Sequence, residues 1–253
     1  MLRITGLAKY FGGVRAVDGL DIQIDKGEIF GLIGPNGSGK STTVNLICGV
    51  FPQTSGTIEL DNVDLGKMAP HQRIESGVSR TFQNIRLFGE LTVWQNLWVA
   101  WRDAPGHETN WLVNWFGSPA DRQHEIQKLL EFSGLGDHSD KPANSLSFGE
   151  QRQLELARAM ASKPKLILLD EPAAGMNSEE VADLKERILT MKELGMTVLL
   201  VEHVMDLVMS VTDRITVLNF GKPIAEGTPV EIQNNEAVQE AYFGSAKNVE
   251  AGA

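Results

Sequence analysis

Three features of the sequence predict an α/β fold built on a mostly parallel core sheet. Short apolar runs typical of buried strands occur at Ile29–Ile33, Leu166–Leu169 and Thr197–Val201. A glycine-rich turn and a helical pattern follow the first run, and helical patterns precede the other two. Strands that alternate with helices form parallel sheets with crossover helices. The stretch from about 84 to 145 has no strand-like run and holds all five tryptophans, which predicts an inserted helical sub-domain.

The remaining elements follow from local patterns. Residues 2–28 are expected to form several short strands with turns, an N-terminal antiparallel β part, because apolar and polar residues alternate in Leu20–Ile24. Residues 214–225 predict an added hairpin. Apolar residues at helical spacing predict helices over 41–49, about 120–132, 151–161 and 179–194.

Composition narrows the class of protein. The chain has 253 residues, a formal net charge of −10 and 42% hydrophobic residues, as in a globular protein rather than a disordered one. The acidic balance argues against a nucleic-acid partner. The apolar runs fall far short of the roughly 20 residues of a membrane span, and the first ten residues lack a signal-peptide pattern. The single cysteine, Cys48, fits a reducing compartment. We therefore expect a cytoplasmic protein.

A phosphate-binding loop is predicted directly after the first apolar run. The pattern G-x-x-x-x-G-K-[ST] is matched in full by Gly34, Pro35, Asn36, Gly37, Ser38, Gly39, Lys40 and Ser41. Glycines let successive backbone N–H groups point inward as an anion cradle, and the following helix adds its positive end. Lys40 supplies a cation for the β- and γ-phosphates, Ser41 offers a hydroxyl to Mg²⁺, and Thr42 adjoins them. The competing interpretation is a glycine-rich turn with a surface lysine.

Two carboxylates end the second apolar run. Asp170 and Glu171 follow Leu166–Leu169, at the strand end where ligands of α/β sheets bind. Asp170 is expected to bind Mg²⁺ with Ser41, and Glu171 to polarise the water that attacks the γ-phosphate. His203 follows the third run and is expected to reach the γ-phosphate or that water. The alternatives are a solvated Asp-Glu turn and an ordinary surface histidine.

The segment 146–151, Leu-Ser-Phe-Gly-Glu-Gln, resembles the signature motif of ATP-binding-cassette (ABC) ATPases, with Phe148 in place of its first glycine. The phosphate loop, Gln83, the signature, Asp170-Glu171 and His203 follow one another in the order of that family. The resemblance implies that ATP and Mg²⁺ are bound, and that two cassettes, identical or paralogous, close head-to-tail around two ATP molecules.

The same resemblance assigns further roles. Ser147, Gly149 and Glu150 would cap the ATP held by the opposite cassette, although Ser147 and Glu150 also fit a helix capping box. Phe11, with Tyr10 as the alternative, would stack on adenine, and Gln83 would link Mg²⁺ or the attacking water to the helical sub-domain. Asn177 replaces the aspartate that is common in the family, which weakens any prediction of charge at the dimer interface.

The resemblance also implies a domain division and a membrane partner. The whole chain, 1–253, would be one ATP-binding domain. Residues 1–83 and 164–240 would form its nucleotide-binding core, 84–163 its helical sub-domain with the signature, and 241–253 its C-terminal tail. Residues 11–17 and 171–177 resemble the ATP-binding subunits of bacterial branched-chain amino acid importers. Such a subunit would lie on the inner face of the membrane, docked on two permease subunits and served indirectly by a periplasmic binding protein. An exporter, another solute importer or a non-transport cassette are the alternatives.

The tryptophans leave two interpretations open. Trp94, Trp98 and Trp101 share one helical face, which would either line a groove for a permease helix or pack into the core of the sub-domain. Trp111 and Trp115 are expected at an interface, because the short insertion around them has little core to join.

Overall fold

The protein is described by a computed structural model that covers residues 1–81, 85–101 and 119–243. Its strands are β1 (Leu2–Phe11), β2 (Val14–Ile24), β3 (Ile29–Ile33), β4 (Ser55–Leu60), β5 (Val63–Asp64), β6 (Val78–Arg80), β7 (Leu166–Asp170), β8 (Thr197–Val201), β9 (Arg214–Asn219) and β10 (Lys222–Gly227). Its α-helices are α1 (Lys40–Ile47), α2 (Pro70–Glu75), α3 (Val93–Ala100), α5 (Pro119–Ser133), α6 (Phe148–Ala161), α7 (Ser178–Glu193), α8 (Met205–Val211), α9 (Pro229–Gln233) and α10 (Glu236–Phe243).

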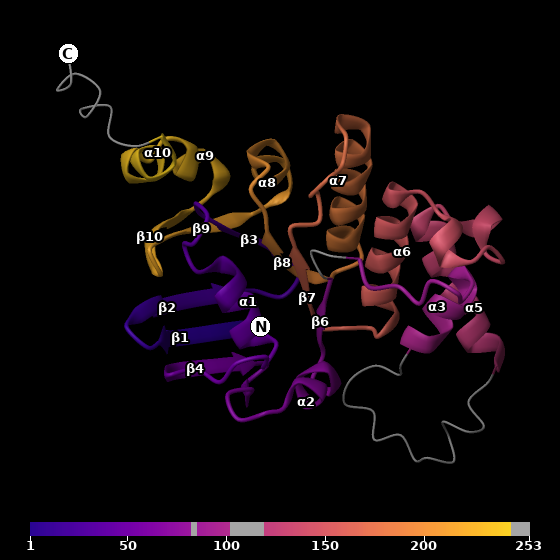
Figure 1. Ribbon diagram of the computed structural model, residues 1–253, viewed down its shortest axis with the longest axis horizontal. Helices are drawn as coiled ribbons and strands as arrows, with labels where there is room; N and C mark the ends of the chain where they lie inside the picture. The colour runs from indigo at the N-terminus through magenta and orange to yellow at the C-terminus, as the bar shows by residue number, and fades with distance from the viewer. Residues whose placement is uncertain (82–84, 102–118, 244–253) are drawn as a thin grey trace.

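The described strands form two sheets. The antiparallel sheet has the order β2-β1-β4-β5, and the core sheet has the order β10-β9-β3-β8-β7-β6. Within the core sheet β9, β3, β8, β7 and β6 are parallel, and only β10 pairs antiparallel, with β9. Figure 1 shows α3, α5 and α6 grouped at one end of the molecule, with α9 and α10 at the other. The predicted α/β fold with a mostly parallel core sheet and an antiparallel β part is confirmed.

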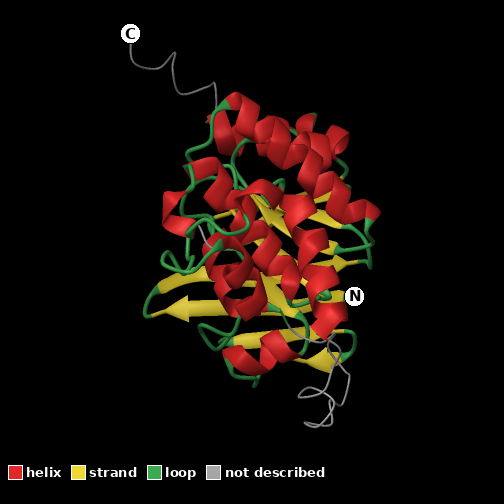
Figure 2. Cartoon of the chain, turned by 90° about the vertical axis from the view of Figure 1, so that its right-hand side faces the viewer, coloured by secondary structure: helices red, strands yellow, loops and turns green. Residues whose placement is uncertain are grey.

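Alternating residues of the core strands face two different hydrophobic clusters, as the two-residue period of a strand requires. In β7, Leu166 and Leu168 belong to the cluster shared with α1 and the antiparallel sheet. Ile167 and Leu169 belong to the cluster shared with α6, α7 and α8. Figure 2 shows helices at the top of the molecule above the core strands, and long strands of the antiparallel sheet in its lower half. Because both faces are covered, the strands read as continuous apolar runs.

The helical group has a core of its own. Residues of α3, α5 and α6 pack together around Leu97, Ile126 and Leu154. Trp94 and Trp98 stack on each other with ring centroids 4.8 Å apart, and with Trp101 they pack partly buried against this cluster. These contacts favour the core interpretation of the tryptophan face. Trp111 and Trp115 lie outside the described residues, and the predicted division into core and helical sub-domain stays a prediction.

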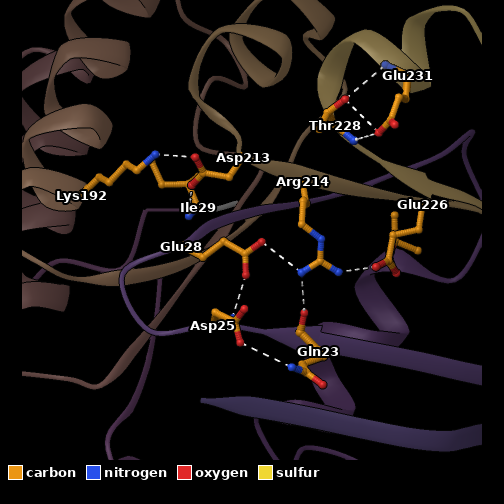
Figure 3. A network of polar contacts seen from close by, with 11 residues as sticks. Gln23, Asp25, Glu28, Ile29, Lys192, Asp213, Arg214, Glu226, Thr228 and Glu231 are labelled. Carbon is orange, nitrogen blue, oxygen red and sulfur yellow. Dashed lines mark hydrogen bonds and ion pairs between the residues drawn. The ribbon is translucent and has the colours of Figure 1, made fainter.

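Arg214 joins the two sheets where they meet (Figure 3). Its Nη1 lies 3.2 Å from Glu28 Oε1 and donates to the backbone oxygen of Gln23, at the end of β2, over 3.3 Å. Its Nη2 pairs with Glu226 of β10. This fork of donors holds β9 and β10 against the β2–β3 connection.

The structure refines the helix boundaries. The helix predicted over 151–161 begins at Phe148, because Ser147 caps it, and the strands of residues 2–24 are two long strands rather than several short ones. None of the helices in the described ranges combines the length and the apolar character needed to cross a membrane.

Candidate functional site

The predicted phosphate loop, residues 34–41, connects the buried strand β3 to α1. Its glycines adopt backbone conformations that other residues rarely take: φ is 149° at Gly34 and 108° at Gly39. A Cβ atom at Gly34 would lie 2.1 Å from the backbone oxygen of Leu218, and one at Gly39 would lie 2.4 Å from that of Ala16. The two glycines are therefore required by the close approach of neighbouring strands as well as by the turn.

Lys40 lies at the start of α1 and is only 6% exposed. Its Nζ donates to the backbone oxygens of Gly34 at 2.7 Å and Pro35 at 3.1 Å, so the side chain folds back over the loop. Burial lowers the pKa of Lys40, while the carboxylates of Glu171 and Asp170 oppose that shift. The structure therefore brings the predicted cation close to both predicted carboxylates, although they are far apart in the sequence.

The chemistry of the loop fits a phosphate group. Ser38 Oγ is buried and has no hydrogen-bond partner within the described chain. Buried hydroxyls are usually hydrogen-bonded, so an oxygen atom of a bound ligand would satisfy this one. Ser41 is exposed and Thr42 half-buried in the first turn of α1, whose helix N-terminus favours anions. Asn36 and Gly37 are exposed at the tip of the loop.

Asp170 is the last residue of β7 and Glu171 follows it directly, near this loop. Asp170 is 5% exposed, and its Oδ2 lies 2.7 Å from Nη2 of Arg80 on the neighbouring strand β6. Glu171 has a φ of 49°, in the left-handed region, and its N–H donates to the oxygen of Val201 at 2.8 Å. Strain of this kind at a non-glycine residue costs of order 1–3 kcal/mol and is typical of functional sites.

His203 is placed by a residue that the sequence analysis missed, Glu202. The side chain of Glu202 is completely buried. Its Oε2 accepts from the N–H groups of His203 at 2.6 Å and Val204 at 3.0 Å, and its Oε1 accepts from that of Ala173 at 2.7 Å. Glu202 thus joins the segments after β7 and β8, and the His203 ring stays 56% exposed. A carboxylate directly after an apolar strand was the available signal.

The helix α6 begins within the signature segment, at Phe148. Ser147 and Glu150 of this segment form the expected capping box. Ser147 Oγ accepts from the N–H of Glu150 at 3.3 Å, and Glu150 Oε2 accepts from the N–H of Ser147 at 2.7 Å. The other oxygen of Glu150 lies 2.8 Å from His138 Nδ1. The bond from Ser147 lowers the pKa of Glu150. A Cβ atom at Gly149 would lie 2.6 Å from Glu180 Oε1, so a larger residue here would displace the carboxylate of Glu180 in α7.

The other predicted site residues have separate surroundings. Phe11 is 44% exposed and makes an edge contact with Phe51, with ring centroids 5.5 Å apart, and the Tyr10 hydroxyl donates to Asp18 at 2.7 Å. Asn177 uses its side-chain oxygen to cap α7. Gln83 lies outside the described residues.

A metal ion would have to share its ligands with a phosphate. Within the described ranges no three His, Cys, Asp or Glu side chains cluster as a metal site. One carboxylate and one hydroxyl, here Asp170 and Ser41, are nevertheless the donors with which proteins hold Mg²⁺ on a bound phosphate, the remaining ligands being water and phosphate oxygens. The residues present therefore fit a Mg²⁺–nucleotide complex.

Comparison with known proteins agrees with this geometry. The family model described as "ABC transporter" matches residues 17–174, and the one described as "Branched-chain amino acid ATP-binding cassette transporter" matches residues 222–248. The chain is 42% identical to the high-affinity branched-chain amino acid transport ATP-binding protein BraF of Pseudomonas aeruginosa, over 97% of this chain and 98% of that protein. It is 41% identical to LivG of Escherichia coli K12 over the same shares.

Solved structures give the same result. A nucleotide-free cassette of an ABC transporter superposes with a TM-score of 0.82 at 32% identity, over 96% of this chain and 99% of that chain. A dimeric cassette bound to ADP and phosphate superposes with a TM-score of 0.74 at 25% identity, over 90% of this chain and 99% of that chain. The chain belongs to the ABC transporter family and is one of its ATP-hydrolysing, nucleotide-binding cassettes.

Proposed function

We propose that this cassette hydrolyses ATP to drive the uptake of branched-chain amino acids. The observation that carries the substrate class is the match of residues 222–248 to the branched-chain cassette family, together with near-full-length identity to BraF and LivG. The cassette would work on the inner face of the membrane, paired with a second cassette, identical or paralogous, and docked on two permease subunits. A periplasmic binding protein would deliver the amino acid to the permeases.

Each residue of the site has a proposed role in hydrolysis. The loop amides and Lys40 bind the β- and γ-phosphates, and Ser41 and Asp170 would hold Mg²⁺, which supplies charge neutralisation on those phosphates. Glu171 orients and polarises the attacking water, and its fixed backbone at the end of β7 aims the carboxylate. His203, fixed at its backbone by Glu202, contacts the γ-phosphate or that water.

Three further roles concern the edges of the site. Phe11 would stack on adenine, since its exposed ring offers a face to the base. Ser147, Gly149 and Glu150 would cap the nucleotide of the opposite cassette from the N-terminus of α6. Gln83 would contact Mg²⁺ or the attacking water. Hydrolysis then requires two chains, because one chain supplies the phosphate loop and its partner supplies the signature.

A pair of variants tests the nucleotide chemistry. Lys40→Ala should abolish tight ATP binding in a titration with a fluorescent nucleotide, while its melting temperature stays that of a folded protein. Glu171→Gln should bind ATP normally, stall turnover and form ATP-dependent dimers on sizing chromatography. Micromolar ATP affinity in Lys40→Ala, or a monomeric Glu171→Gln at saturating ATP, would contradict the proposal.

Uptake tests the substrate. The chain is co-purified with its permease subunits, reconstituted into liposomes with the binding protein and supplied with ATP on the cassette side. Labelled leucine should accumulate with the natural chain and not with Glu171→Gln. Accumulation of a different solute in preference to leucine, isoleucine and valine would refute the branched-chain assignment and leave the ATPase assignment intact.

A further inference from the structure

Arg80, the last residue of β6, bridges two parts of the nucleotide site. Its Nη2 lies 2.7 Å from Asp170 Oδ2, and its Nη1 donates to Asn45 Oδ1 at 2.7 Å. The side chains of Arg80 and Asp170 are only 14% and 7% exposed. Asn45 stands four residues after Ser41 in α1, on the same face of the helix. One guanidinium therefore joins the helix that carries the Ser41 hydroxyl to the strand that carries the Asp170 carboxylate.

The backbone around this bridge is fixed as well. Arg80 is in register with Leu168 of β7, and the N–H of Thr81 donates to the oxygen of Leu168 at 2.9 Å. The planar guanidinium has donors at fixed angles, so two contacts determine the separation of the groups that they hold. The contact to Oδ2 leaves Oδ1 of Asp170 for another ligand.

We propose that Arg80 is a positioning residue for the metal site: by bridging Asn45 and Asp170 it holds the carboxylate at the distance from Ser41 at which both bind one Mg²⁺ on the nucleotide. This inference rests on the proposed function, since it needs a bound Mg²⁺–nucleotide complex.

Charge and position predict opposite effects of removing Arg80. A positive charge beside a carboxylate repels a cation, so if charge dominated, the loss of Arg80 would strengthen the binding of Mg²⁺. If the bridge dominates, the loss frees the carboxylate to turn and weakens the binding of Mg²⁺, as the loss of groups that orient metal ligands does by 10–100-fold in other proteins. We infer that the bridge dominates, because both of its contacts are 2.7 Å long and shielded in part from solvent.

The test compares nucleotide affinity with and without Mg²⁺. A fluorescent ATP analogue is titrated into the natural chain, Arg80→Lys and Arg80→Met, in EDTA and in saturating Mg²⁺. The ratio of the Kd in EDTA to the Kd in Mg²⁺ should fall about tenfold in both variants. Methionine removes the bridge altogether, and lysine keeps the charge but cannot span both partners. Affinity in EDTA should stay within about twofold. Arg187→Met is the matched control: Arg187 is 15% exposed and lies 2.9 Å from Asp183, outside the phosphate loop, and its ratio should not change.

A second variant keeps the test informative if Arg80→Met fails to fold. Asn45→Ala removes one end of the bridge and retains Arg80 and Asp170, and its ratio should fall by less than that of Arg80→Lys. An unchanged or raised ratio in Arg80→Lys, with a normal melting temperature, would overturn the inference while the proposed function stands. A natural chain whose nucleotide affinity does not depend on Mg²⁺ would overturn the inference alone, and a natural chain that binds the ATP analogue in neither condition would overturn the proposed function as well.

Discussion

Replacing Arg73 with methionine should destabilise the fold by removing a buried cap from the phosphate-loop helix. Arg73 of α2 is 2% exposed. Its Nη1 donates to the backbone oxygens of both Leu46 and Ile47, its Nε to that of Met68 at 3.1 Å, and its Nη2 to that of Gly66 at 3.4 Å. The oxygens of Leu46 and Ile47 lie in the last turn of α1, where carbonyls lack partners within the helix. The Leu46 oxygen also accepts from the N–H of Gly49 at 3.2 Å, so removing Arg73 takes the donor mainly from the oxygen of Ile47.

The magnitude follows from these contacts. A hydrogen bond to a charged donor contributes about 1.5–3 kcal/mol, and a buried acceptor left without a donor costs about 1–3 kcal/mol. Burial lowers the pKa of Arg73, which shows that its charge is held at a desolvation cost, and methionine recovers part of that cost. With two well-placed bonds to the end of α1 and that partial recovery, we expect a net loss of about 3 kcal/mol. This is a large part of a typical unfolding free energy of about 5–15 kcal/mol.

Urea unfolding at pH 7, followed by tryptophan fluorescence, measures this loss. Arg3→Met is the control, because Arg3 is exposed on β1 and its replacement should change the unfolding free energy by less than about 0.5 kcal/mol. Gly49→Ala should act on the same site, since its Cβ would lie 2.6 Å from Arg73 Nε and φ at Gly49 is 75°. A loss below about 1 kcal/mol for Arg73→Met would refute the reasoning that this guanidinium caps α1.

Three further predictions concern other parts of the chain. Ser147→Arg should leave the ATP affinity of a single cassette unchanged and block ATP hydrolysis, measured as released phosphate, since Ser147 contributes to the site of the opposite cassette. A loss of ATP affinity would contradict this. Glu202→Gln should lower the unfolding free energy by about 2 kcal/mol in a thermal melt, because the amide NH₂ that replaces one oxygen would face either the N–H donor of Ala173 or those of His203 and Val204; an unchanged melt would count against it. Burial raises the pKa of Cys48 from 9.0 to about 11, so the folded thiol should react with a disulfide reagent at pH 8 roughly 100-fold more slowly than the unfolded one. Because the pKa of Cys48 is higher in the folded than in the unfolded chain, its contribution to the free energy of unfolding is complete below pH 9 and is lost as the pH rises towards 11. Equal labelling rates, or an unfolding curve identical to that of Cys48→Ala from pH 8 to pH 11, would contradict the raised pKa of this half-buried thiol.

Features encoded in contiguous residues could be predicted from the sequence. The phosphate loop, the strand that ends in Asp170 and Glu171, and the capping box of Ser147 with Glu150 each depend on residues that are neighbours along the chain. The α/β class followed from apolar runs, because a sheet covered on both faces leaves continuous hydrophobic strands. The two interpretations of Trp94 and Trp98 could not be separated in this way, since a groove lining and a core face have the same helical spacing.

The sequence by itself determined which chemistry this protein carries, and only the tertiary structure decided which side chains hold that chemistry in place. The bridge from Arg80 to Asp170 joins residues 90 positions apart, and Arg73 reaches the end of α1 across 26–27 positions. No local pattern marks such partners. They are selected by the desolvation of charged groups in a packed interior, where each buried donor must find an acceptor that the fold, rather than the neighbouring sequence, brings within reach.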